Sequence, residues 1–305
     1  MATKAEISVA FEAILGRQIS DNDKIDQLLD MDIANIGKYL RNTSEYLNNT
    51  KSIEATGKWV AAKILKSRYL INLNLADKFV SFGCLIDNYE PYETEVFRRA
   101  IDPLCDVVDV GTNIGWYTFN ALEVIGSEAR VHGVEANTIV YNNYIESIRL
   151  NQLFDRVSAH NCAAGDIETE VTLGWHEQSK NLGSASIGNY SDQQVINKVK
   201  MFPLDMLVPA ARKVGIIKID IEGAELLALK GANRIIQRDR PKIILEFNPS
   251  GMEAIMRAKA SDLFDWLLVH YSNIYQITPQ GVSQVNSIDD ISIKDGIANL
   301  LAENH

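Results

Sequence analysis

The stretch VVDVGTNIGWYT, residues 107–118, decides the fold. Its β-branched start predicts a buried strand that carries Asp109 near its end, and the segment from Gly111 to Gly115 predicts a tight turn. A helix is expected to begin at once, at Trp116. A strand, a glycine turn and a helix in this order bring the backbone close to a ligand at the carboxyl edge of a parallel sheet. Such a turn could bind a cofactor that contains adenosine, either NAD or S-adenosylmethionine.

The same alternation of strand and helix continues on both sides of this stretch. Further strands are predicted in ARVHGVE, RVSAHNCA, VGIIKIDI and PKIILEF, with helical segments between them. This order predicts an α/β fold with a mostly parallel sheet and helices on both faces. An inserted hairpin is expected from TEVTLGW to KVKMFPL, around a Ser/Gly/Asn-rich loop. A terminal hairpin is expected in NIYQITPQGVSQV, where Pro-Gln-Gly forms the turn.

The distribution of charge indicates where the α/β part begins. Residues 1–85 hold 11 basic and 10 acidic side chains (+1), and residues 86–305 hold 19 and 30 (−11). Helical spacing of apolar residues predicts a small all-α module over residues 1–50. It also predicts a linking helix through IEATGKWVAAKILKSRYL, so residues 51–85 are interpreted as a linking helix and strand. Residues 86–305 form the predicted α/β domain.

Composition excludes several classes of protein. The net charge of −10 in 305 residues argues against a nucleic-acid binder, which needs clustered Lys and Arg. No apolar run is long enough to span a membrane, and the N-terminus lacks a signal core, so we expect a cytoplasmic protein. The spacing of Cys84, Cys105 and Cys162 favours buried thiols over disulfides, and neither the cysteines nor the histidines form a metal motif.

The spacing within the turn favours one cofactor over another. A dinucleotide fingerprint requires GxGxxG, and this chain has Asn113 at the second glycine position. S-adenosylmethionine has no pyrophosphate, and its positive charges favour a nearby carboxylate such as Asp109. Glu135, at the end of the next strand, is placed to bind the ribose of either cofactor. No tyrosine is followed by Lys four residues later, which disfavours a nucleotide-sugar oxidoreductase.

A third signal is IIKIDIEGAELLALKGA, residues 216–232. Its strand delivers Asp220 and Glu222 to the carboxyl edge, opposite the glycine turn. Lys218 on that strand is interpreted as a strand-end partner. PKIILEFN adds Glu246 at the end of a neighbouring strand, where a buried charge needs a partner or a role.

These motifs together resemble the FkbM-type S-adenosylmethionine-dependent methyltransferases, over about residues 88–301. The resemblance implies a class I methyltransferase fold, with helices on both faces of its sheet. The cofactor residues that it implies are Glu90, Glu93, Asp109, Gly111, Asn113, Gly115, Glu135, Asn137, Ala163, Ala164, Asp166 and Asp220. Asp220 and Glu222 would face the methyl group and the acceptor. Thr112 and Thr138 depart from the usual family residues, Ala and Pro.

The N-terminal residues resemble a second family. FEAILGRQ and NTSEYL are similar to a short helical module, with an LGR turn, that is joined to bacterial glycan-modifying enzymes. Phe11, Leu15, Gly16, Arg17 and the segment 44–46 carry this likeness. A generic helical cap on the enzyme is the alternative interpretation.

We expect methyl transfer from S-adenosylmethionine to a sugar hydroxyl of a glycan or a related small molecule. Asp220, Glu222 and His176, which lies in the inserted segment, are the candidate bases. The alternatives are a nicotinamide-dependent oxidoreductase, an inactive methyltransferase-like interaction protein, and a methyltransferase for a polyketide-type or carboxylate acceptor. Oligomeric state, including a homo-oligomer, stays open.

Overall fold

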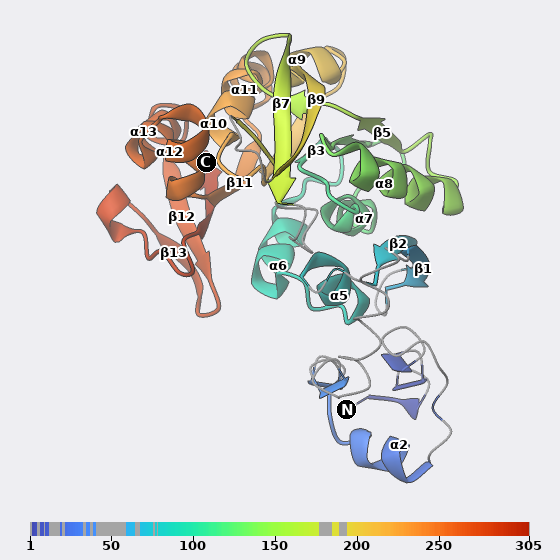
Figure 1. Cartoon of the computed structure of the whole chain (residues 1–305). Coiled ribbons are helices and arrows are strands. Elements are labelled where there is room, and N and C mark those ends of the chain that lie inside the picture. Colours follow the sequence, from blue (N-terminus) through green and yellow to red (C-terminus); the bar gives the residue numbers. More distant parts are fainter. Residues whose placement is uncertain are drawn as a thin grey trace. The chain divides into compact units, whose positions relative to one another are not determined.

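The computed structural model describes residues 2–4, 7–8, 10–11, 19, 22–32, 35–36, 39–40, 59–64, 68–75, 77, 79–176, 185–188 and 194–304. It divides into two compact units, Met1–Pro91 and Tyr92–His305 (Figure 1). The charge distribution puts the boundary at residues 85 and 86, and the structure puts it at residues 91 and 92.

The first unit contains helix α2 (Asn22–Leu28), strands β1 (Trp59–Lys63) and β2 (Leu70–Asn74), and helix α5 (Val80–Leu85). The strands pair antiparallel, with Trp59 opposite Asn74. The linking helix predicted over residues 53–70 is therefore wrong over β1 and at Leu70, where β2 begins. Pairing satisfies the backbone of β1 and β2, and Ile71 and Leu73 are buried in the process, which outweighs the helical spacing of the apolar residues.

Much of the predicted N-terminal module lies outside the residues that the structure describes. Phe11 is buried and helical. Leu15, Gly16, Arg17 and the segment 44–46 lie outside the described residues, so the all-α module and its resemblance stay predictions.

The second unit is built on an eight-stranded sheet with the order β13-β12-β14-β11-β10-β3-β4-β5. From β5 to β11 neighbouring strands are parallel, and β14 lies antiparallel between β11 and β12. The predicted mostly parallel α/β sheet is confirmed. Its strands are β3 (Asp106–Val110), β4 (Val131–Val134), β5 (Val157–His160), β10 (Val214–Ile219), β11 (Lys242–Phe247), β12 (Asn273–Thr278), β13 (Gly281–Gln284) and β14 (Ala298–Glu303).

Both predicted hairpins are present. β12 and β13 pair antiparallel around the Pro-Gln-Gly turn, as predicted. The inserted hairpin pairs β7 with β9 in a second sheet of order β6-β9-β7-β8. The strands of this sheet are β6 (Ala163–Ala164), β7 (Thr169–His176), β8 (Ser186–Ile187) and β9 (Gln194–Phe202).

Helices cover both faces of the large sheet. Successive side chains of a strand point to opposite faces, so the apolar residues of each strand need helices packed on both sides. Val108 and Ile217 belong to one core cluster with Leu229 and Phe264, which lie on α10 and α13. On the other face the Tyr144 ring of α8 packs against the glycines of β4 and of the turn before α7. Figure 1 shows α7 and α8 in green and α10 to α13 in orange. The helices are α6 (Pro91–Ala100), α7 (Trp116–Leu122), α8 (Thr138–Leu150), α9 (Leu204–Leu207), α10 (Glu225–Lys230), α11 (Asn233–Asp239), α12 (Pro249–Met256) and α13 (Ala260–His270), with a short 3-10 helix over Ile288–Asp290.

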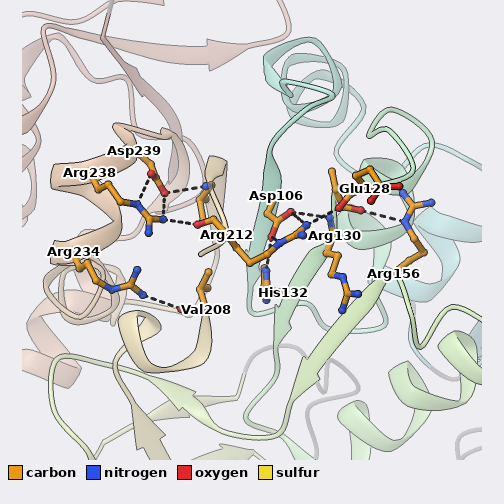
Figure 2. Close-up of polar contacts among 12 residues, drawn as sticks. Asp106, Glu128, Arg130, His132, Arg156, Val208, Arg212, Arg234, Arg238 and Asp239 are labelled. Atoms are coloured by element: carbon orange, nitrogen blue, oxygen red, sulfur yellow. Dashed lines mark hydrogen bonds and ion pairs between the residues drawn. The ribbon is translucent and has the colours of Figure 1, made fainter. Parts of the chain in front are cut away.

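The amino edge of the sheet is held by carboxylates paired with arginines (Figure 2). Buried Asp106, the first residue of β3, accepts hydrogen bonds from the Arg212 guanidinium, from His132 Nε2 at 2.9 Å and from the Arg130 backbone N–H at 2.9 Å. Burial alone would raise the pKa of Asp106, but these bonds outweigh it and lower the pKa to about 2. This edge is therefore a structural clamp that joins β3, β4 and the segment before β10.

A second pair supports the same edge. Asp239 accepts a hydrogen bond from Arg238 Nε at 2.6 Å and another from the Val214 backbone N–H at 3.0 Å. Arg234 donates to the carbonyl oxygen of Val208 at 2.8 Å. These contacts join α11 to the start of β10 through Val214 and to the end of α9 through Val208.

Candidate active site

The glycine turn follows β3 as predicted, and the structure explains why glycine is required. Gly111 has φ 78° and Gly115 has φ 96°, a left-handed backbone that side chains disfavour. A Cβ on Gly111 would lie 1.9 Å from the carbonyl oxygen of Asp220, so the turn packs directly against the segment that follows β10. Asn113 is also left-handed, at φ 51°. The two predicted motifs thus meet through their backbones at the carboxyl edge.

Asp109 lies beneath the turn. Its side chain is buried and accepts a 2.7 Å hydrogen bond from the hydroxyl of Thr118 on α7. Thr118 in turn lies 2.9 Å from the Tyr144 hydroxyl. Burial raises the pKa of Asp109 to about 6. The carboxylate thus supports the first turn of α7, and its predicted contact with a cofactor stays a prediction.

Glu135 is joined to the glycine turn by a direct hydrogen bond. Its Oε2 accepts from the Asn113 backbone N–H at 2.9 Å, and its Oε1 accepts from the Asn137 backbone N–H at 2.8 Å. Burial raises the pKa of Glu135 to about 7. Each carboxylate oxygen can accept a second hydrogen bond, as two ribose hydroxyls would require. Asn137 itself is buried and caps α8 by accepting from the Ile139 N–H at 3.0 Å.

The strip predicted to lie along an adenine adjoins Glu135. Asn161 Nδ2 donates to the carbonyl oxygen of Glu135 at 2.8 Å, just before this strip begins. Ala163 and Ala164 are buried as β6, and Asp166 is exposed. This hydrogen bond holds the predicted ribose residue, Glu135, next to the start of the predicted adenine strip.

The segment after β10 forms a second tight turn at the same edge. The Asp220 backbone N–H donates to the carbonyl oxygen of Val110 at 3.0 Å, which aligns the ends of β10 and β3. Glu222 has φ 57° and Gly223 has φ 111°. A Cβ on Gly223 would lie 2.3 Å from the carbonyl carbon of Gly251, so α12 packs closely against this turn.

Glu225 holds this turn closed and was not predicted from the sequence. It is fully buried, and its Oε1 accepts from the backbone N–H groups of Ile221 at 3.1 Å and Gly223 at 3.0 Å. Burial raises the pKa of Glu225 to about 7. The signal was its place five residues beyond Asp220 in the same motif, at the first position of α10.

Three carboxylates, Asp220, Glu222 and Glu246, influence one another at the ends of β10 and β11. Glu222 accepts a 3.3 Å hydrogen bond from Asn248 Nδ2, and burial followed by the charges of Asp220 and Glu225 raises its pKa to about 7. Burial and the charges of Asp220 and Glu222 raise the pKa of Glu246 well above its usual range. Like charges in one site favour protonation of some members, and the raised pKa of Glu246 favours its protonated form.

Helix α6 connects both sides of this edge. Trp116 Nε1, at the start of α7, donates to Thr94 Oγ1 at 2.8 Å. Asn299 Nδ2 of β14 donates to Glu93 Oε1 at 3.2 Å, and Asn299 is directly opposite Glu246 in the β11–β14 pair. Glu93 thus lies on the side of the carboxylates, whereas the resemblance assigns it to the cofactor. Its role there stays a prediction.

Two further predicted residues have no described place in the site. His176 ends β7, but its side chain lies outside the described residues. Glu90 belongs to the first unit, with φ 43°. Trp175, which precedes His176, is buried and packs within the inserted sheet. The contributions of His176 and Glu90 stay predictions.

Neither a metal site nor a disulfide is formed by the described residues. No group of three His, Cys, Asp or Glu side chains in that part of the chain is arranged to hold a metal ion. Cys84, Cys105 and Cys162 are buried thiols, as predicted. No helix in the described ranges is both long and apolar enough to cross a membrane.

Several solved structures are similar to this chain at low sequence identity. A methyltransferase FkbM from Methylobacillus flagellatus KT is 18% identical, with a TM-score of 0.44, over 87% of this chain and 60% of its own length. The METTL16 methyltransferase domain is 11% identical, with a TM-score of 0.43, over 85% of this chain and 81% of its own. The O-methyltransferase TomG from Streptomyces achromogenes, solved with SAM, is 9% identical, with a TM-score of 0.39, over 70% of this chain and 78% of its own.

Sequence comparison gives the decisive match. A search of the curated proteins finds no significant relative. The family model for the methyltransferase FkbM domain, however, matches residues 109–271, which is more than half of the 305 residues. The match begins at Asp109 and includes both turns described above. The chain therefore belongs to the FkbM methyltransferase family and has the class I methyltransferase fold.

Proposed function

We propose that this protein transfers a methyl group from S-adenosylmethionine to a hydroxyl oxygen of a sugar, on a glycan or a related small molecule. The observation that carries this proposal is the hydrogen bond between Glu135 and the Asn113 backbone N–H. It fixes an acidic residue beside the glycine turn, with room to accept from two ribose hydroxyls. Asn113 also replaces the second glycine of a dinucleotide fingerprint, which favours S-adenosylmethionine over NAD.

The residues present fit this cofactor. A Cβ on Gly111 or Gly115 would meet Asp220 or Tyr144, so the turn must stay free of side chains at both positions, and Gly111 and Asn113 remain partly exposed for a ligand. The surrounding groups are carboxylates with raised pKa values, and a ligand that carries a sulfonium and an ammonium favours their ionised forms. Glu135 would bind the ribose, and the strip from Ala163 to Asp166 would lie along the adenine.

Asp220 and Glu222 are the residues that we assign to the acceptor. S-adenosylmethionine supplies an activated methyl group on a sulfur that departs as a neutral thioether. The acceptor hydroxyl must lie in line with that group, and its proton passes to a carboxylate as the new carbon–oxygen bond forms. Glu222 suits this task because its pKa is raised to about 7, near the operating pH. Its hydrogen bond from Asn248 fixes its orientation.

The test is incubation with methyl-labelled S-adenosylmethionine and a panel of cell-envelope glycans, read by mass spectrometry. We expect label on a hydroxyl oxygen of one glycan class. Asp220→Asn and Glu222→Gln should each reduce turnover at least about 100-fold while cofactor binding is retained, as loss of a general base predicts. Exposed Glu253→Gln on α12 is the control and should behave as the wild type.

Other results would redirect the proposal. Label on a carboxylate or a polyketide-type hydroxyl would keep the chemistry and change the acceptor class. Unchanged turnover in both acidic variants would remove them from the mechanism. Binding of S-adenosylmethionine without transfer to any acceptor, together with intact function of Glu135→Ala in cells, would favour an interaction protein.

A further inference from the structure

Lys218 of β10 is a buried lysine in the middle of the large sheet, with its side chain 1% exposed. It is directly opposite Asp109 of β3 and opposite Ile244 of β11. Alternation of side chains puts Glu246, two residues beyond Ile244, on the same face as Lys218. Carboxylates of β3 and β11 therefore flank the ammonium from both neighbouring strands.

The ammonium contacts both motifs of the carboxyl edge. Lys218 Nζ lies 3.6 Å from Asp220 Oδ2 and 4.9 Å from the ring centroid of Tyr117 on α7. Tyr117 is the second residue of the helix that follows the glycine turn, and a cation over an aromatic face is attracted to it. The charge of Lys218 also lowers the pKa of Asp109 and of Glu246, against the raising effect of burial. The groups near Lys218 thus include Asp109, Asp220, Glu246 and Tyr117.

One buried ammonium cannot neutralise three carboxylates. A buried charge is stable only when it is paired, so Lys218 requires at least one ionised partner. Asp220 is the carboxylate in direct ion-pair contact with Lys218, and its side chain is 25% exposed. Burial and the neighbouring acids raise the pKa of Glu246, and Asp109 accepts a hydrogen bond from Thr118.

We propose that Lys218 is the positioning residue of the site: its ammonium holds the Asp220 carboxylate oriented toward the acceptor, and balances the charge of Asp109 beneath the glycine turn. This inference rests on the proposed function, since it assigns the group that prepares the acceptor side. Lys218 takes no part in bond making. Its loss raises the proton affinity of the whole carboxylate cluster, because the cluster then titrates without its cation.

The first test compares Lys218→Met with Lys213→Met, in which the neighbouring exposed lysine is replaced. In Lys218→Met we expect the acid limb of the pH profile of kcat to move up by about one pH unit. Turnover at pH 7 should fall about tenfold and recover toward pH 9, with the KM for S-adenosylmethionine within about threefold of wild type. Lys213→Met should keep the wild-type profile. An unchanged profile, or the same loss at every pH, would overturn the proposal.

The second test needs no methyl transfer, so it separates this inference from the proposed function. Loss of Lys218 raises the pKa of buried acids in the folded state, so folded Lys218→Met should lose more stability to urea from pH 6 to pH 9 than the wild type does. The double variant Lys218→Met/Asp220→Asn removes both charges and should unfold at a higher urea concentration than Lys218→Met. This comparison also serves if the single variant folds poorly. A double variant no more stable than Lys218→Met would contradict the pairing.

Discussion

The two edges of the large sheet use the same residue type in opposite ways. Asp106 and Asp109 lie three residues apart on β3, and both are buried. At the amino edge, Asp106 is paired with Arg212 and its pKa is lowered to about 2. At the carboxyl edge, burial raises the pKa of Asp109 to about 6. Figure 2 shows the arginine-rich edge.

This difference extends beyond one strand. Asp239 at the amino edge also pairs with an arginine and has a lowered pKa, whereas Glu135 and Glu222 at the carboxyl edge have pKa values near 7. No arginine forms an ion pair with these two glutamates within the described ranges. Carboxylates that are paired stabilise a fold, whereas those held near neutral pH are suited to binding a cation or taking a proton. The amino edge therefore stabilises the fold, whereas the carboxyl edge is suited to binding and proton transfer.

The largest expected effect comes from filling the glycine turn. Gly111→Ala would place a Cβ 1.9 Å from the Asp220 carbonyl oxygen at a left-handed φ, and should cost about 4 kcal/mol of unfolding free energy. Gly126→Ala, whose Cβ would lie 3.2 Å from the Pro103 carbonyl oxygen, should cost about 1 kcal/mol. Urea unfolding followed by circular dichroism measures both. Equal losses would mean that the two motifs do not pack as described.

The next prediction sets the two aspartates of β3 against each other. Asp106→Asn leaves the Arg212 guanidinium without its charged partner and should cost about 3 kcal/mol at pH 7. Asp109→Asn removes a charge that burial disfavours and keeps an oxygen for the Thr118 hydroxyl, so it should be neutral or stabilising. The urea concentrations at the unfolding midpoints of the two variants, compared with the wild type, test this prediction. A large loss in Asp109→Asn would erase the distinction between the edges.

A smaller effect is expected on ligand affinity. Glu135→Gln should weaken the binding of S-adenosylhomocysteine about tenfold, because a charged acceptor of hydrogen bonds becomes neutral. Glu128→Gln, an exposed glutamate seven residues earlier, should bind as the wild type does. Isothermal titration calorimetry at pH 7.5 measures both affinities. Wild-type affinity in Glu135→Gln would remove Glu135 from the ribose site.

The smallest effect is the contribution of Glu135 to the pH dependence of stability. Its pKa of about 7 in the folded state lies above its ordinary value, so the folded state binds a proton that the unfolded chain has already released. Stability is therefore lost as the pH rises through 7, by about 1 kcal/mol from pH 6 to pH 8. Glu135→Gln should lack this part of the slope, and Glu128→Gln should retain it. Urea unfolding at the two pH values tests the prediction.

Local patterns predicted the parts of the site that are continuous in sequence. Two motifs are of this kind: the strand, glycine turn and helix around Gly111, and the turn after Asp220. Each depends on residues that are neighbours in the sequence. Glu135 was identified by its spacing from the glycine turn, and the bond to Asn113 confirms that they meet. The ion pair between Lys218 and Asp220 agrees with the interpretation of Lys218 as a strand-end partner.

The parts that escaped prediction depend on distant pairing. Helical spacing could not reveal that Trp59–Lys63 pairs with Leu70–Asn74, because the gain comes from hydrogen bonds between strands. Asn299 contacts Glu93 across 206 positions of sequence, which no local pattern reports. The burial of Asp109 beneath α7 depends on the Thr118 rotamer and on Tyr144 packing, so sequence alone could not distinguish a supporting carboxylate from an exposed one.

The most direct test of the carboxyl edge as a methyl-transfer site is a calorimetric titration of the wild-type protein with S-adenosylhomocysteine and with NAD under the same conditions. We expect saturable binding of the thioether at one site per chain and no binding of NAD, because Asn113 replaces the second glycine that a dinucleotide fingerprint requires. Binding of NAD without binding of S-adenosylhomocysteine would contradict it.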